Sequence, residues 1–287
     1  MKNFIKCFVF VMVMCLSAVG SAVESNRNFA NVLSADGVSI AYSVYGKGET
    51  ALVFIHGWSC DSRYWYRQIP YFSKKYRVVT IDLAGHGNSG ADRKEYTMEK
   101  FAQDVSVVLD DADIKKAVLV GHSMGGGVIM QTAVMEPERV IGLIGVDTLE
   151  DIARPWEKTD IDQVFTPIKE DFKNNSKAFV RSMFVEGADS ELVETIVNDI
   201  SSADPEIAIN VMEHYLNSRE YELIKKVKVP LKSVNADLWP TNVDGNKKAA
   251  PEYELFLMKG VGHFLMLESP DEFNVNLEKA VEEIEGL

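Results

Sequence analysis

The feature that most constrains the fold is a serine between glycines, at the junction of an apolar run and a helical pattern. Residues 117–120 read AVLV, and the pentapeptide GHSMG at 121–125 follows before apolar periodicity resumes. This is the G-x-S-x-G pattern in the strand-to-helix context that gives the pattern its meaning. The turn forces an unfavourable backbone conformation on Ser123, and glycines on both sides remove side chains that would clash. We therefore expect an exposed Ser123 hydroxyl with a helix amino terminus aimed at it.

The rest of the chain alternates short β-type runs with amphipathic helical patterns. This alternation is typical of βαβ units and predicts an α/β fold, with a mainly parallel twisted sheet flanked by helices. Residues 149–226 differ, because they are charged and helix-like and contain no convincing buried strand. We interpret residues 23–148 and 227–287 as one sheet domain, interrupted by a helical cap insertion at 149–226. Such an insertion lies naturally above the carboxyl ends of the strands, where open α/β sheets bind ligands.

The amino terminus has the layout of a secretory signal peptide. Lys2 and Lys6 precede an apolar run at residues 7–16, and small residues end at Ala22. A positive start, a short apolar middle and a small-residue cleavage site predict a signal peptide over residues 1–22. No later segment has the roughly 18 apolar residues of a membrane-spanning helix. We expect cleavage near Ala22 and an exported protein, periplasmic or secreted, with no membrane span in the mature chain.

Composition narrows the range of partners. The 287-residue chain has a formal net charge of −13 at pH 7. An acidic surface argues against nucleic acid and anionic membranes as partners. The spacings that hold zinc are absent, as is a phosphate-binding loop, so no metal or cofactor is expected. The expected partner is a small-molecule substrate.

Four blocks together carry a family resemblance. They are HGW at 56–58, DLAGHGNS at 82–89, the pentapeptide at 121–125 and GVGHF at 260–264. Over nearly the whole mature chain the sequence resembles the α/β-hydrolase family, in the cap-bearing branch with a serine nucleophile. His263 follows a strand far beyond Ser123, as the order serine, acid, histidine requires, and is the expected base. The resemblance implies that the backbone N–H groups of Trp58 and Met124 form the oxyanion hole.

The acid of the expected triad has two candidates. Relatives usually carry it in a Gly-Asp-x-Asp pattern nine residues beyond a proline, but that count from Pro230 reaches Trp239. Asp237 lies nearby, where the first and normally non-catalytic aspartate of the pattern would be. A second arrangement, similar to that of haloalkane dehalogenases, puts the acid 24 residues past the nucleophile, which is Asp147. We prefer Asp147 and keep Asp237 open.

A serine nucleophile predicts acyl transfer, because it attacks a carbonyl and forms an acyl-enzyme that water hydrolyses. We expect a carboxylesterase-like enzyme acting on a small or medium ester with an apolar acyl part. Lactonases, C–C bond hydrolases and haloperoxidase-like enzymes share this framework, and so do non-enzymatic ligand-binding proteins, so these stay open. The aromatic and methionine residues of the insertion could line the pocket, although we expect most of them to pack between helices. They are Trp156, Phe165, Phe172, Phe179, Met183, Phe184, Met212 and Tyr215.

Overall fold

Within the computed structural model, residues 28–155 and 157–286 are described, and they contain one sheet of eight strands. The predicted signal peptide, residues 1–22, lies outside the described residues. The strands are β1 (Asn28–Leu33), β2 (Ser39–Tyr45), β3 (Ala51–Ile55), β4 (Arg77–Ile81), β5 (Ala117–His122), β6 (Val140–Val146), β7 (Leu231–Ala236) and β8 (Glu254–Met258). Their order across the sheet is β1-β2-β4-β3-β5-β6-β7-β8. β2 is antiparallel to β1 and β4, and all other neighbouring pairs are parallel.

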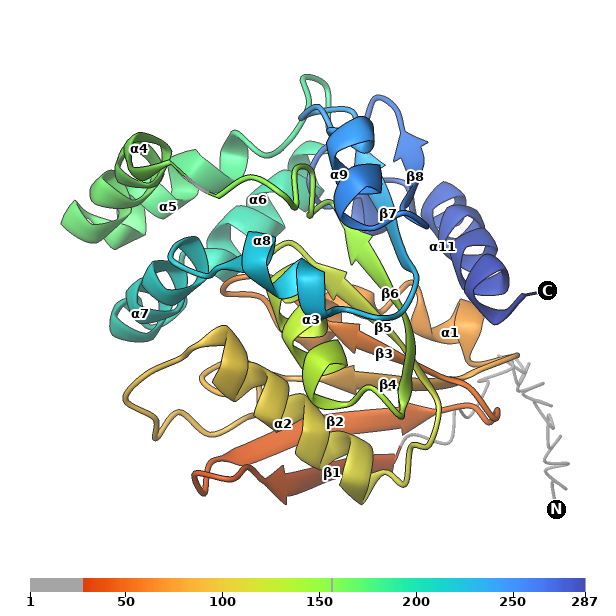
Figure 1. The fold of residues 1–287 in the computed structure, drawn as a ribbon. Helices are drawn as coiled ribbons and strands as arrows, with labels where there is room; N and C mark the ends of the chain where they lie inside the picture. The colour runs from red at the N-terminus through yellow and green to blue at the C-terminus, as the bar shows by residue number, and fades with distance from the viewer. Residues whose placement is uncertain (1–27, 156, 287) are drawn as a thin grey trace, which may run out of the picture.

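The helices of the described residues lie on both faces of this sheet and beyond the carboxyl ends of its central strands. They are α1 (Ile69–Phe72), α2 (Met98–Asp111), α3 (Gly125–Met135), α4 (Lys158–Glu170), α5 (Phe172–Arg181), α6 (Ser190–Ile200), α7 (Pro205–Leu216), α8 (Glu220–Leu223), α9 (Val243–Ala249), α10 (Leu265–Glu268) and α11 (Pro270–Glu285). α2 and α3 pack on one face, and α1 and α11 lie on the other (Figure 1). Coverage on both sides explains why central strands such as β3 and β5 are mainly apolar and buried along their whole length. The predicted α/β fold with a mainly parallel sheet is confirmed.

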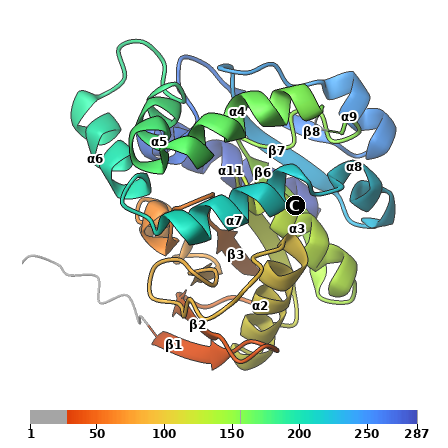
Figure 2. The ribbon, with the colours of Figure 1, turned by 90° about the vertical axis from the view of Figure 1, so that its left-hand side faces the viewer.

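The helices between β6 and β7 form a separate group. Figures 1 and 2 show α4 to α7 beyond the carboxyl ends of the central parallel strands. Aspartates cap three of these helices, because the carboxylates of Asp171, Asp189 and Asp204 accept hydrogen bonds from first-turn N–H groups of α5, α6 and α7. These helices fall within the predicted insertion, whose boundaries at 149 and 226 stay a prediction.

Two buried histidines hold the loops that follow β3 and β4. The Leu83 N–H donates to His56 Nε2 at 3.0 Å, so the ring proton of His56 is on Nδ1, 2.8 Å from the Gly57 carbonyl oxygen. His86 Nδ1 lies 3.0 Å from the Ala84 carbonyl oxygen, and the two rings are 5.0 Å apart. Burial, and then the charge of His56, lower the pKa of His86 to about 3. Both histidines therefore act as neutral braces of the loops that carry Trp58 and Ser89.

Replacing His86 by asparagine should flatten the acid dependence of stability. In the unfolded chain the pKa of a histidine is about 6.5. Between pH 6.5 and about 3 the unfolded chain binds a proton that the folded chain excludes, so the free energy of unfolding falls as pH falls. The slope from one such group is about 1.4 kcal/mol per pH unit.

Urea unfolding of the wild type and His86→Asn at pH 6.5 and pH 5 measures this effect. Contributions of the carboxyl groups are common to both proteins and cancel in the comparison. We expect the wild type to lose about 2 kcal/mol more than the variant over this interval. Equal losses would show that His86 is protonated in the folded protein.

Candidate functional site

The predicted turn at Ser123 is present between β5 and α3. Ser123 has φ 52°, and its N–H donates to the Val146 carbonyl oxygen at 3.0 Å. This left-handed conformation is costly for a residue with a side chain and is held by the surrounding packing. A Cβ at Gly121 would lie 2.4 Å from the Gly125 carbonyl oxygen, and one at Gly125 would lie 2.8 Å from that of Ile55. Both glycines are therefore required for the sharp approach of strand and helix.

The structure brings Asp147 and His263 together. His263 lies in the loop after β8, and its N–H donates to the Met183 carbonyl oxygen at 2.8 Å. Its ring Nδ1–H donates to Asp147 Oδ2 at 2.6 Å, and the other carboxylate oxygen accepts the Ala236 N–H at 2.7 Å. Asp147 follows β6 with φ 44°, and its N–H donates to the Val234 carbonyl oxygen. Backbone contacts from neighbouring strands therefore fix the carboxylate and the tautomer of the imidazole.

Burial controls the charge of this pair. Both side chains are almost completely buried. Burial lowers the pKa of His263, so the imidazole is neutral at pH 7 and its Nε2 carries a lone pair. Burial also raises the pKa of Asp147, while the Ala236 N–H opposes that rise by stabilising the carboxylate.

The structure does not bring Asp237 to His263. Asp237 is exposed, and its carboxylate accepts the Gly260 N–H at 2.9 Å. It therefore holds the start of the loop that leads to His263 without contacting the imidazole. Trp239, which occupies the usual acid position, presents its ring to His263 in an edge contact with centroids 5.4 Å apart.

Ser123 and His263 face one cavity of about 710 Å³. In the described part of the chain, no hydrogen bond joins Ser123 Oγ to His263. Both residues line the cavity, so Ser123 Oγ and His263 Nε2 can each contact a molecule bound there. The cavity is mostly apolar, and α4 to α7 supply much of its wall. Its apolar lining from these helices and the segment after α5 comprises Val164, Pro167, Ile168, Ala178, Phe179, Val180, Met183, Ile200, Met212 and Leu216.

Four of the insertion residues singled out in the sequence line the cavity, namely Phe179, Met183, Met212 and Tyr215. Phe165, Phe172 and Phe184 are not among its lining residues and pack within the apolar core instead. Trp156 lies outside the described residues.

The two predicted oxyanion-hole donors belong to residues close to Ser123, since Met124 follows it directly and a Cβ at Gly57, next to Trp58, would lie 3.2 Å from the Ser123 Cβ. In the described residues neither the Trp58 N–H nor the Met124 N–H donates a hydrogen bond, and Met124 directly precedes the first turn of α3. The Trp58 indole N–H donates to the Ala208 carbonyl oxygen of α7 at 2.8 Å. Its ring also packs edge-on against Phe172 and Phe179 of α5. Trp58 thus joins the loop after β3 to the helices above the sheet.

His122 is a residue of the site that sequence reasoning missed. Its buried ring lies 4.6 Å from the His263 ring, and its Nε2–H donates to the His263 carbonyl oxygen at 2.9 Å. Burial, and then the charge of His263, lower its pKa well below the usual value. His122 occupies the variable position of G-x-S-x-G, so the motif itself carries no signal for it. It holds the backbone of the loop that carries His263.

Two further properties concern metals and membranes. Within residues 28–155 and 157–286, no three His, Cys, Asp or Glu side chains are grouped so that they could hold a metal ion. None of the helices that the structure describes has both the length and the apolar character needed to cross a membrane.

Known proteins that are similar to this chain have the same fold. Over residues 50–221 the chain matches the family model of the alpha/beta hydrolase fold. It is 27% identical over 210 residues to 3-oxoadipate enol-lactonase 2 of Acinetobacter baylyi, covering 71% of this chain and 77% of that protein. It is 38% identical over 115 residues to the dihydrolipoyllysine-residue acetyltransferase component of the acetoin cleaving system of Cupriavidus necator. That match covers 40% of this chain and only 30% of the longer relative.

Among solved structures, Est816, described as an N-acyl homoserine lactone degrading enzyme, superposes with a TM-score of 0.74 at 26% identity. The superposition covers 87% of this chain and 99% of Est816. A family model that matches more than half of the chain, together with the turn at Ser123 and the eight-stranded sheet, leads to one conclusion: the chain belongs to the α/β-hydrolase fold family.

Proposed function

We propose that this protein is a serine hydrolase that cleaves a small or medium ester by acyl transfer. The observation that carries the proposal is the hydrogen bond from His263 Nδ1–H to Asp147, beside a cavity that also contains Ser123. Nucleophile, base and acid are the three parts of such a triad, and the triad is recognised by geometry and roles rather than by sequence position.

In this mechanism His263 Nε2 takes the proton of Ser123 Oγ while the oxygen attacks the ester carbonyl. The imidazolium that forms is stabilised by Asp147, and it then gives the proton to the leaving alkoxide as the tetrahedral intermediate collapses. A water molecule attacks the acyl-enzyme with the same histidine as base, which releases the acid and restores Ser123. The charge of the forming imidazolium stabilises the ionised form of Asp147, whose hydrogen bond to Nδ1–H keeps the imidazole in the required tautomer.

The backbone N–H groups of Trp58 and Met124 act as the oxyanion hole. Both lack an acceptor in the described residues, and Met124 lies at the amino terminus of α3, where the helix dipole favours negative charge. Donors arranged in advance around a developing oxyanion are worth about 10² to 10³ in turnover each.

The substrate preference follows from the cavity. Its apolar wall favours an ester with an apolar acyl part, and its volume of about 710 Å³ is in the range of small-molecule sites. Opening a lactone uses the same acyl-transfer steps, so a lactone substrate is the nearest alternative, and the names of the enol-lactonase and of Est816 favour it. C–C bond cleavage, haloperoxidase-like chemistry and ligand binding without turnover stay as further alternatives within the fold.

Export is part of the proposal and rests on the amino-terminal sequence alone. The layout of residues 1–22 supports a cleaved leader, with a mature protein that begins near Val23 and meets its substrate outside the cytoplasm.

The two aspartates provide a matched test of the proposed triad. Asp147→Asn removes the charge that supports the imidazolium, so the turnover of p-nitrophenyl butyrate should fall by about 10⁴. Asp237→Asn removes a charge that does not contact His263 and keeps a side-chain oxygen that can accept the Gly260 N–H. Its turnover should therefore stay within about tenfold of wild type, equal to about 1.4 kcal/mol.

Circular dichroism of both variants checks that they are folded. A large loss in Asp237→Asn with little change in Asp147→Asn would contradict the proposed triad. Wild-type turnover that is no faster than that of Ser123→Ala would refute ester hydrolysis altogether.

A further inference from the structure

The base lies in an irregular loop, residues 259–264, between β8 and α10. The His263 N–H donates to the Met183 carbonyl oxygen at 2.8 Å, and the His263 carbonyl oxygen accepts the Nε2–H of His122 at 2.9 Å. Both backbone groups of His263 are therefore bonded to segments outside the loop. The backbone on either side of His263 needs partners of its own.

A single carboxylate binds the backbone on both sides of His263. Glu268 Oε2 accepts the Gly262 N–H at 2.9 Å, and Glu268 Oε1 accepts the Phe264 N–H at 3.1 Å. Glu268 is half-buried at the end of α10. Burial raises its pKa, and the two N–H groups oppose that rise by stabilising the carboxylate. Because the two donors flank His263, the two bonds together restrict the backbone from which the imidazole projects.

The loop also fits closely against the segment after α5. A Cβ at Gly262 would clash with the Met183 carbonyl oxygen, and it would lie 2.9 Å from Phe184 Cα and 3.1 Å from Glu268 Oε1. The rings of Phe184 and Phe264 stack with centroids 5.2 Å apart. The loop is thus held by packing on the side of α5 and by hydrogen bonds on the side of α10.

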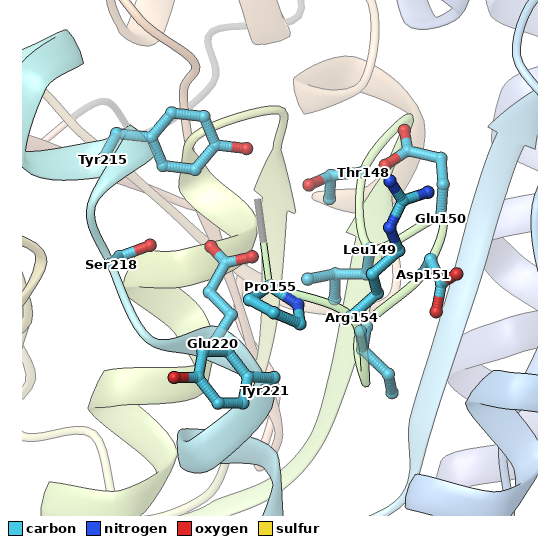
Figure 3. Close-up of a pocket in the computed structure, with 11 residues that line it drawn as sticks. Thr148, Leu149, Glu150, Asp151, Arg154, Pro155, Tyr215, Ser218, Glu220 and Tyr221 are labelled. Carbon is cyan, nitrogen blue, oxygen red and sulfur yellow. The ribbon is translucent and has the colours of Figure 1, made fainter. Parts of the chain in front are cut away.

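The loop that carries the acid is held by neutral amides instead. Thr148 and Leu149 follow Asp147 and line a second cavity of about 170 Å³ (Figure 3). Asn235 Nδ2 donates to the Thr148 carbonyl oxygen at 3.1 Å, and Asn246 Nδ2 donates to that of Leu149 at 2.8 Å. Here the backbone presents acceptors, whereas the loop of the base presents two N–H donors. A carboxylate offers two acceptor oxygens for those donors, and a side-chain amide offers only one.

We propose that Glu268 is a positioning residue for the base, because its carboxylate fixes the backbone on both sides of His263. During the reaction His263 Nε2 takes the proton of Ser123 Oγ and gives it to the leaving oxygen, and a misplacement of about 1 Å can lower a rate about 10²-fold. As a statement about turnover this inference rests on the proposed function. As a statement about the His263–Asp147 hydrogen bond it does not depend on Ser123.

The kinetics of Glu268→Gln test the effect on turnover. The amide keeps one acceptor oxygen and puts an NH₂ group in place of the other, so one backbone N–H loses its acceptor. We expect kcat for p-nitrophenyl butyrate to fall by about tenfold to a hundredfold. KM should change less than about twofold, because Glu268 is not among the residues that line the main cavity. The rate of fluorophosphonate labelling of Ser123 should fall with kcat, since it needs the same base.

Glu272→Gln is the matched control. Glu272 is exposed in the first turn of α11, so its replacement removes the same formal charge close by in the chain and should leave kcat unchanged. Glu268→Asp keeps the charge but shortens the side chain by one methylene group, so it should also lower kcat. It provides a second test if the amide variant does not fold, which urea unfolding of each variant checks. A folded variant at position 268 with the wild-type kcat, or an equal fall in Glu272→Gln, would overturn the proposal.

Proton NMR separates this inference from the proposed function. The Nδ1–H proton of His263, in its 2.6 Å hydrogen bond to Asp147, should give a downfield resonance that is absent from His263→Gln. In Glu268→Gln this resonance should shift or broaden, and in Glu272→Gln it should stay as in the wild type. That result without any ester turnover in the wild type would support the positioning role and refute the proposed hydrolysis. Ester turnover with kcat and the resonance unchanged in Glu268→Gln would do the reverse.

Discussion

The site depends on the hydrogen bond between His263 and Asp147, which are 116 residues apart in the sequence. Parallel strands make this contact possible, because the carboxyl ends of β6 and β8 lie at the same edge of the sheet, separated only by β7. β7 also supplies the Ala236 N–H that holds the second carboxylate oxygen. The turn at Ser123 opens at the same edge, since β5 lies beside β6. One sheet register thus positions all members of the candidate triad.

The helices above the sheet supply much of the wall of the cavity at this edge. Trp58 connects the two parts, because its indole N–H donates to Ala208 of α7 and its backbone N–H has no acceptor among the residues that the structure describes. The Met183 carbonyl oxygen, in the segment after α5, accepts the His263 N–H and so holds the loop of the base from above. Packing of the helical segment therefore affects the geometry of the reacting groups as well as access to them. A substitution at these contacts is expected to change both substrate binding and turnover.

Much of this arrangement could be predicted from the sequence, because local patterns carry it. The glycines around Ser123 predict a strained turn, and the alternating strand and helix patterns predict a parallel sheet. Spacing favoured Asp147 over Asp237 but left both open, because the choice depends on which loop reaches His263 in space. The same holds for His122, which no motif position marks. Contacts between segments that are far apart in the chain produce no periodic pattern in the sequence, so they could not be predicted from it.

The central claim is that Ser123 is an activated nucleophile, and covalent labelling tests it most directly. The protein is treated with a fluorophosphonate at pH 7.5, and the intact mass is measured before proteolytic mapping of the adduct. An activated serine should give one adduct per chain, located on Ser123, and Ser123→Ala should give none. An unlabelled wild-type protein, or an adduct on another residue, would contradict the account and favour a protein that binds its ligand without turnover.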